Sequence, residues 1–332
     1  MATTEMSLEQ IEQLATSVFE SNGCDKNNTR ALVKTVVTAE RDGSHSHGLF
    51  RVPGYIASLR SGKVKGDASP VVSKKTAAVI NVHGDSGFAP LAIERGIPAL
   101  AEAASTVGVG VMGITHAHHF AALWPETEAL AERNLIGLAC VCYKPVVAPA
   151  GGNERLLGTN PISFAWPRPG SSPFVYDMAT AAMALGEVQI AARDGKQVAP
   201  GVGLDENGQE TTDPAEIVKG MLLPFGGYKG SAIAIMVELL ASAAINEQFS
   251  FEAGETDVVD GGPPQGGEFM LAISPDLLAG DGWAEHAETF FERLDAIEGV
   301  RMPGERRHKN RLSAAPRAIN SELLARIEAL IN

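Results

Sequence analysis

Residues 91–115, LAIERGIPALAEAASTVGVGVMGIT, decide which class of α/β fold this chain adopts. Apolar spacing predicts a helix over residues 91–105, and the apolar run at 109–115 predicts a strand. Gly108, Gly110 and Gly113 match GxGxxG, the pattern of dinucleotide-binding turns. That mechanism needs a strand before the glycines and a helix after them, so that a pyrophosphate meets the helix N-terminus. The order here is inverted, and we interpret the glycines as a helix-to-strand turn and not as a Rossmann motif.

The sequence after Thr76 continues as a mixture of strands and helices. A long polar loop is expected over residues 194–213. The other expected strands are 77–82, 136–143, 173–178 and 268–274, and the other expected helices are 123–134, 180–193 and 228–245. The middle of the chain therefore predicts an α/β region.

The two ends of the chain are predominantly helical by the same criteria. Ser7 and Gln10 form a capping-box pattern before the first helix, and a second helix is expected from Asp25 to Gly43. Pro53 opens a third, short helix that reaches about residue 62. The tail is helical at 285–298 and 321–330. We expect the helical head and tail to pack together around the α/β middle.

Composition places the chain among globular proteins of about two domains. It has 332 residues, 45% of them apolar, and 27 basic against 40 acidic residues give a net charge of −13. A pI near 5.1 argues against nucleic acid as a partner, because no global positive field gathers phosphates. The longest apolar run, 231–245, is interrupted by Glu238, and we expect a buried helix and no membrane span.

The N-terminal segment and the cysteines point to one compartment. MATTEMSLEQ has neither a basic region nor an apolar core, so no secretory signal is expected. The cysteines, Cys24, Cys140 and Cys142, form no CxxC pair and are typical of reduced thiols. We therefore expect a cytoplasmic location.

Six histidines raise the question of a metal. His45 and His47, then His116, His118 and His119, form two clusters, with His83 between them. Imidazole is a frequent zinc ligand, but no HExxH is present and no cysteine pair accompanies the histidines. We expect no metal site.

The segment 44–51, SHSHGLFR, has the residue types for one small anionic substrate. Arg51 offers two parallel donors to a carboxylate, and His47 carries a proton near neutral pH. A helix end with solvated side chains is the alternative, and spacing alone leaves both open.

Two further segments suit phosphate groups. Residues 224–231, PFGGYKGS, place glycines and Lys229 before a long helix, but they do not match a Walker P-loop. A glycine-rich turn is the alternative. Residues 301–311, RMPGERRHKNR, are the only strongly basic run in an acidic chain. Either a solvated face or a contact with a phosphorylated cofactor explains this run.

Taken together, several segments resemble the malate/L-lactate dehydrogenase superfamily, the non-Rossmann group of NAD(P)-dependent oxidoreductases. Residues 185–187, LGE, stand where hydroxy-acid members more often carry RGK, and they resemble the branch that reduces Δ1-piperideine-2-carboxylate and Δ1-pyrroline-2-carboxylate. The resemblance covers nearly the whole chain. Its segments are SHGLFRVPGYIASLRSG (46–62), HHFAALW (118–124), LLGTNPISFAWP (156–167), VYDMATAAMALGEVQIAARDG (175–195), TTDP (211–214), LLPFGGYKGSAIAIMVELL (222–240) and MPGERR (302–307).

The resemblance implies an α/β architecture whose cofactor domain has a largely antiparallel sheet, flanked by a helical domain. The helical domain would comprise residues 1–75 and 280–332, and residues 76–279 would form the NADP-binding and substrate domain. Members of the superfamily usually form homodimers. The implied substrate is a small cyclic imino acid and the implied cofactor is NADPH.

The resemblance also assigns site residues. His47 would be the proton donor, with Ser46 and Glu187 as relay partners. Arg51 would bind the substrate carboxylate in a pocket shared with Thr159, Leu185 and Gly186. The residues implied to hold NADPH are His119, Phe120, Ala121, Ala122, Leu123, Asp177, Met178, Ala179, Tyr228, Lys229, Met302, Pro303, Gly304, Glu305, Arg306, Arg307 and His308. Tyr228 departs from the histidine expected there, and Arg306 and Arg307 are the candidates for the 2′-phosphate.

The residue types suit the implied reaction, in which a hydride reaches the imine carbon and the nitrogen gains a proton. A carboxylate at position 187 would orient His47 and favour its protonated form. Three other readings stay open: a 2-hydroxy-acid dehydrogenase of the malate, lactate or ureidoglycolate type on the same scaffold, a histidine-based metallohydrolase, and a cofactor-binding protein without catalysis.

Overall fold

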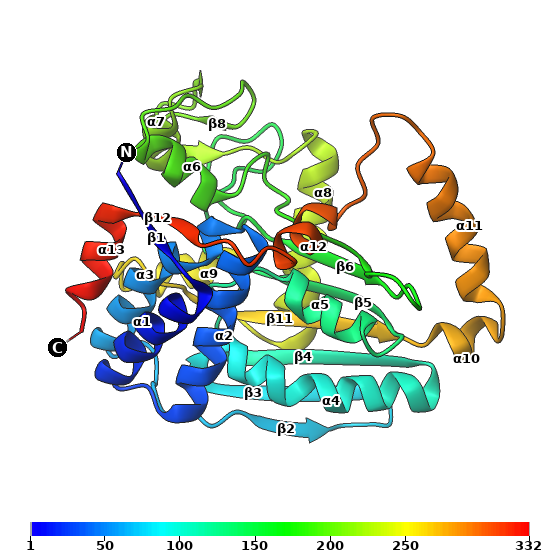
Figure 1. Cartoon of the computed structure of the whole chain (residues 1–332). Helices are drawn as coiled ribbons and strands as arrows, with labels where there is room; N and C mark the ends of the chain where they lie inside the picture. The colour runs from blue at the N-terminus through cyan, green and yellow to red at the C-terminus, as the bar shows by residue number, and fades with distance from the viewer. Residues whose placement is uncertain (1, 332) are drawn as a thin grey trace.

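The computed structural model describes residues 2–331, and its N-terminal part is helical as predicted (Figure 1). Ser7 caps α1 (Leu8–Ser21) with a complete capping box, and Asp25 caps α2 (Lys26–Asp42). Gly43 ends α2 in the left-handed conformation, with φ 78°. Two 3₁₀ turns, η1 (His45–His47) and η2 (Leu49–Arg51), then lead into α3 (Val52–Arg60).

A seven-stranded sheet forms the centre of the molecule, in the order β2-β3-β4-β11-β5-β6-β7. Only β3 and β4 are parallel, and every other neighbouring pair is antiparallel, which confirms the largely antiparallel sheet. The strands are β2 (Val71–Lys74), β3 (Val79–Phe88), β4 (Val109–His118), β5 (Ile136–Val141), β6 (Ile162–Trp166), β7 (Phe174–Met178) and β11 (Gln265–Ile273). The helix before the glycine pattern is α4 (Ala89–Val107), and β4 runs through the glycines, so the inverted order is confirmed.

Helices cover both faces of this sheet. Alternate residues of a strand point to opposite faces. Ala139 of β5 packs in one core with α4, whereas the next residue, Cys140, packs with Val237 and Ala241 of α8 (Tyr228–Ala241). The short α5 (Trp124–Ala131) lies on the α4 side, where its Leu130 joins the same core (Figure 1).

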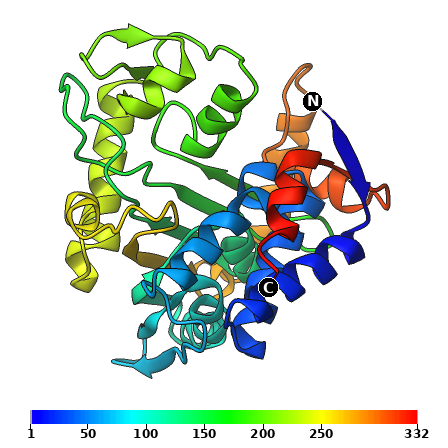
Figure 2. The same cartoon turned by 90° about the vertical axis from the view of Figure 1, so that its left-hand side faces the viewer.

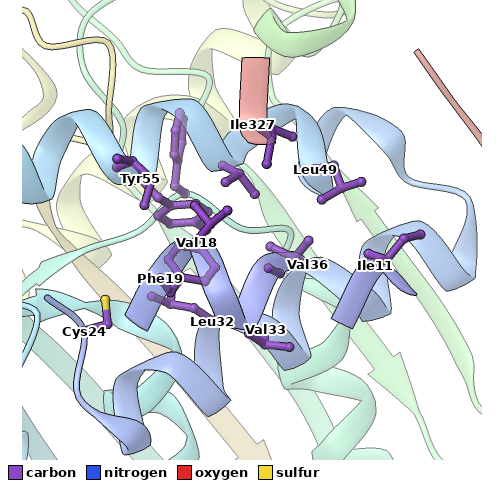
Figure 3. Close-up of a cluster of buried hydrophobic side chains, with 14 of the residues drawn as sticks. Ile11, Val18, Phe19, Cys24, Leu32, Val33, Val36, Leu49, Tyr55 and Ile327 are labelled. Atoms are coloured by element: carbon purple, nitrogen blue, oxygen red, sulfur yellow. The ribbon is translucent and has the colours of Figure 1, made fainter. Parts of the chain in front are cut away.

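The helical head packs against the C-terminal end of the chain. β1 (Thr3–Met6) pairs antiparallel with β12 (Arg317–Asn320), and α13 (Ser321–Glu328) follows directly. Figure 3 shows Ile327 of α13 in one buried cluster with Ile11, Val18 and Leu49. Head and tail therefore share a core, and Figure 2 shows α13 against the N-terminal helices.

A small unit with its own core follows β7. Figure 2 shows it set apart from the helical head. It contains α6 (Leu185–Arg193), β8 (Gly203–Leu204), β9 (Glu210–Thr211), α7 (Pro214–Lys219) and β10 (Met221–Leu222), packed around Val188, Ile217 and Leu222 among others. The remaining elements are η3 (Ala243–Ile245), α9 (Ser250–Glu255), α10 (Pro275–Ala279), α11 (Trp283–Asp295) and α12 (Glu305–Arg311).

Several predicted boundaries are wrong for identifiable reasons. The helix expected from residue 180 begins at Leu185, because Thr180 and Ala182 bond to the backbone of Thr159 and Leu223 instead of the next helical turn. The loop 194–213 contains β8 and β9, and β2 and β6 were not predicted. The basic run 301–311 is helical over α12.

The apolar helix expected over residues 228–245 ends as α8 at Ala241, is followed by η3, and is more exposed than expected. It is the one helix within residues 2–331 that is long and apolar enough to cross a membrane by length and composition, and 39% of it is buried. Core helices of soluble proteins pass the same test, so the finding is weak support for a membrane span. Ile235, Met236 and Leu239 are exposed whereas Ala234, Val237 and Ala241 are buried, so the helix expected to be buried is buried on one face only.

Candidate active site

A cleft of about 360 Å³ lies where the helical head, the sheet and the α6 unit meet. It collects residues from six separate segments of the chain. Of the residues singled out from the sequence, those that line it are Ser46, His47, Arg51, His119, Phe120, Ala121, Ala122, Leu123, Thr159, Asp177, Met178, Ala179, Leu185, Gly186, Glu187, Arg306 and Arg307. The sequence therefore identified most of this cleft.

His47 stands on the short η1 turn at the cleft. Its Nδ1 is hydrogen-bonded to the hydroxyl of Ser46 at 3.0 Å, as the expected relay requires. Burial, and then the nearby charges of Arg51 and His119, lower the pKa of His47 to about 3. With this pKa the ring is neutral at physiological pH, and an anion beside Arg51 would oppose one cause of the shift.

Arg51 lies four residues further on, beside His47. Its guanidinium stands 4.4 Å from the centre of the Phe120 ring, and its Nε is buried without a hydrogen-bond partner. Burial also lowers the pKa of this guanidinium. Within residues 2–331 its side chain has no ion pair, so a ligand carboxylate would supply the missing acceptor.

The N-terminal turn of α6 closes the cleft over Arg51. A Cβ on Gly186 would lie 2.6 Å from Nη2 of Arg51, so a side chain at this position would displace the guanidinium. Glu187 lines the cleft with an exposed side chain, and no hydrogen bond between it and His47 is present. Its role as a relay partner stays a prediction.

Asp177 fixes the segment that was expected to hold the cofactor. Its Oδ2 accepts hydrogen bonds from the backbone N–H groups of Leu123 (2.9 Å) and Trp124 (3.2 Å). This joins the chain after β4 to the end of β7. Burial raises the pKa of Asp177. The carboxylate of Asp177 therefore fixes the backbone of the cleft wall through these hydrogen bonds.

The two arginines proposed for the 2′-phosphate differ in their surroundings. Arg307 donates to the carbonyl of Val175 (2.9 Å) and stacks 5.0 Å from the centre of the Trp124 ring. Arg306 is exposed at the cleft and makes no hydrogen bond or ion pair with the residues that the structure describes. Arg306 is thus the freer cation.

The other predicted cofactor residues lie outside the cleft lining. Tyr228 and Lys229 begin α8, with Tyr228 74% exposed. His308 turns toward the carbonyl of Pro173, 3.0 Å from its Nε2. The helix α12 begins at Glu305, directly after Met302, Pro303 and Gly304. Their contacts with a cofactor stay predictions.

A buried cluster behind the cleft was missed. Nε2 of His119 lies 3.1 Å from Oε1 of Glu126 and 3.9 Å from Oε2 of Glu268. Burial raises the pKa of Glu126 to about 8 and that of Glu268 well above its usual value. Among residues 2–331 this is the one group of three such side chains close enough to surround a metal ion.

The expected absence of a metal stays a prediction. The two histidine clusters seen in the sequence come together only in part: His47 and His119 both line the cleft, whereas the rings of His83 and His116 stack at 4.4 Å and His45 pairs with Glu40. Glu126 and Glu268 come from α5 and β11, 142 positions apart in the printed sequence, so no local motif signals them. Tyr143, another cleft residue that was missed, ends the strand predicted at 136–143.

Comparison with known proteins identifies the class. Residues 6–327 match the family described as malate/L-lactate dehydrogenase, and the chain belongs to that family. It is accordingly an oxidoreductase that uses a nicotinamide cofactor, NAD or NADP.

The similar proteins indicate which branch of this family the chain resembles. The chain is 40% identical to the Δ1-pyrroline-2-carboxylate reductase of Ancylobacter novellus, with 98% of this chain and 97% of that protein covered. It is 41% identical to the Δ1-pyrroline-2-carboxylate/Δ1-piperideine-2-carboxylate reductase of Pseudomonas aeruginosa, with 97% and 99% covered. The crystal structure of Δ1-piperideine-2-carboxylate reductase from Pseudomonas syringae superposes with a TM-score of 0.93 at 40% identity, covering 99% of this chain and 100% of that one.

Proposed function

We propose that this enzyme reduces cyclic imino acids with NADPH: Δ1-piperideine-2-carboxylate to L-pipecolate and Δ1-pyrroline-2-carboxylate to L-proline. The observation that carries the proposal is the buried guanidinium of Arg51, which has no acidic partner among residues 2–331 and lies beside His47. Such a pair suits a substrate with a carboxylate next to the reacting C=N bond. The printed names of the similar proteins support the same substrate class.

The residues of this chain suggest how the reaction proceeds. Arg51 binds the carboxylate through two parallel hydrogen bonds and so fixes the adjacent imine carbon. His47 gives a proton to the ring nitrogen, while Ser46 holds the imidazole at Nδ1. When bound, the reduced nicotinamide supplies the hydride that the imine carbon accepts. One hydride and one proton convert C=N into CH–NH, and His47 regains its proton from solvent.

Substrate binding and protonation are coupled in this scheme. Arg51 is one cause of the low pKa of His47, and the substrate carboxylate neutralises that charge. Binding therefore raises the affinity of His47 for the proton that it must donate. Without substrate, burial and then the free guanidinium together keep the imidazole neutral.

The cleft suits NADPH in two respects. Arg306 supplies an exposed cation without a partner among the described residues, and Asp177 fixes the end of the wall of residues 119–124 by accepting hydrogen bonds from Leu123 and Trp124. Arg306 would contact the 2′-phosphate, which distinguishes NADPH from NADH.

The remaining expectations are also proposals. We propose a homodimer, with a helical domain of residues 1–75 and 280–332 and an α/β domain of residues 76–279. A cytoplasmic location is supported by Cys24, Cys140 and Cys142, which are free and buried.

The test follows NADPH absorbance with both imino acids, with pyruvate and oxaloacetate, and again with NADH. We expect fast turnover of the imines, slow turnover of the keto acids and preference for NADPH. Faster turnover of the keto acids would identify a 2-hydroxy-acid dehydrogenase instead. His47→Ala and Arg51→Ala at full activity would refute the proposed site.

A further inference from the structure

Glu40 lies directly behind the turn that carries His47 and Arg51. Its side chain is 2% exposed and projects from α2. Oε1 accepts the backbone N–H of Leu49 at 2.8 Å, and Oε2 pairs with Nδ1 of His45 at 2.8 Å. His45 and Leu49 each stand two residues from His47. One carboxylate therefore holds the chain on both sides of the imidazole.

The carboxylate fits closely against the turn. A Cβ on Gly48 would lie 2.1 Å from Oε1 of Glu40, so only glycine lets the carboxylate reach the next amide. Leu49 is fully buried, and a buried N–H needs an acceptor from the protein. Oε1 of Glu40 is that acceptor.

Glu40 is itself held by the C-terminal part of the chain. Arg317 donates from Nε to the carbonyl of Glu40 (3.3 Å) and from Nη2 to that of Arg41 (3.2 Å). Asn310 donates to the carbonyl of Asp42 (3.1 Å). The end of α2 is thus tied to β12 and α12, and the carboxylate has a fixed base.

We propose that Glu40 is a positioning residue that sets both the proton donor and the carboxylate-binding arginine of the reaction. It does not line the cleft and acts through the turn, so it touches neither substrate nor cofactor. The inference rests on the proposed function for the roles of His47 and Arg51. It adds to that function the residue that fixes their relative placement.

The length of the side chain matters more than its charge in this arrangement. Aspartate keeps the charge but withdraws both oxygens by one methylene, so it does not span from α2 to Leu49 and His45. Glutamine keeps the length and an oxygen acceptor for Leu49. A displacement of about 1 Å at a reacting group costs on the order of 100-fold in rate.

The experiment compares Glu40→Asp and Glu40→Gln with the wild type, and His45→Gln is the matched control that removes only the exposed partner. We expect Glu40→Asp to lower kcat/KM by roughly 100-fold, with lower kcat through His47 and higher KM through Arg51. Glu40→Gln and His45→Gln should stay within about threefold of the wild type. The Kd for NADPH should not change in any variant.

Amide exchange of the peptide over residues 44–51 gives a readout that needs no activity. Glu40→Asp should speed exchange in this peptide, whereas Glu40→Gln should protect it as in the wild type. Wild-type kcat/KM and unchanged exchange in Glu40→Asp would overturn the inference, as would equal losses in Glu40→Asp and Glu40→Gln. A wild type that reduces no imino acid would refute the proposed function, while the exchange data would still test the turn.

Discussion

At the scale of single residues, the chemistry of the cleft depends on charges that are buried close together. Burial lowers the pKa of His47, and the nearby charges of Arg51 and His119 lower it further. Behind them, the carboxyl groups of Glu126 and Glu268 are too buried to ionise readily. Both arrangements have consequences that titration can measure.

Removing the charge of Arg51 should raise the pKa of His47. Arg51→Gln leaves burial and His119 in place, so we expect the pKa to rise from about 3 but to stay below its ordinary 6.5. Titration of the imidazole by NMR, without substrate or cofactor, measures this directly. Arg60→Gln, an exposed residue outside the cleft, is the control. An unchanged pKa of His47 in Arg51→Gln would mean that the charge of Arg51 does not affect the imidazole.

Glu126 should make the folded protein less stable as the pH rises. Its pKa is about 8 in the folded protein against 4.5 ordinarily, so the folded state holds an extra proton between these values. The stabilisation is present below pH 4.5 and is lost as the pH rises through about 8. Glu126→Gln should flatten the fall, by up to about 1.4 kcal/mol per pH unit. Urea unfolding of both proteins from pH 5 to pH 9 tests it, and parallel curves would contradict it.

At the scale of elements, α12 carries two adjacent arginines, Arg306 and Arg307, whose surroundings differ. The helix places Arg306 at the cleft and turns Arg307 inward onto β7 and Trp124. A loop would not separate the two side chains so reliably. Both arginines line the cleft, but only the side chain of Arg307 has partners among residues 2–331.

Alanine substitutions should distinguish the roles of Arg306 and Arg307. Arg306→Ala should raise the KM for NADPH about tenfold with little change for NADH, because one charge-assisted contact is lost. Arg307→Ala should instead lower the unfolding free energy by about 1–2 kcal/mol, since it loses a hydrogen bond and a contact with the Trp124 ring. Steady-state kinetics with both cofactors and urea unfolding measure the two effects. The reverse pattern would assign the phosphate to Arg307.

At the scale of the whole molecule, an ion cluster joins three distant segments. Arg311 of α12 contacts Asp42 of α2 at 2.7 Å and Glu128 of α5 at 2.8 Å. Asp42 is fully buried and Glu128 nearly so. The cluster holds the C-terminal segment against the helical head and the sheet, next to the cleft.

Arg311→Ala should therefore destabilise the protein strongly. The substitution removes a positive partner from two buried carboxylates, which lowers the unfolding free energy by about 3 kcal/mol. Arg30→Ala, which removes an exposed pair with Glu94, should cost less than about 1 kcal/mol. Arg311→Ala should also lose less stability in acid than the wild type. Arg41 and Arg311 lower the pKa of Asp42 in the folded protein, and the stabilisation that this gives is lost as the pH falls through the folded pKa. Equal unfolding free energies for the two variants would contradict this.

Local signals in the sequence were sufficient for the main elements. Ser7, Asp25 and Gly43 marked helix ends through capping chemistry that involves only neighbouring residues. The helix before the glycines excluded a Rossmann turn because that motif depends on the order of adjacent elements. The residue types of segment 44–51 suited a carboxylate site but left a solvated helix end open, and the structure places His47 and Arg51 in one cleft.

Only the tertiary structure decided which distant groups meet. Glu40, Glu126 and Glu268 carry no local motif, and their roles come from burial and from partners on other elements. The start of α6 was set by backbone bonds to Thr159 and Leu223, which no helix periodicity contains. Sequence encodes local propensity and residue chemistry, whereas burial and charge coupling arise when the chain closes around the cleft.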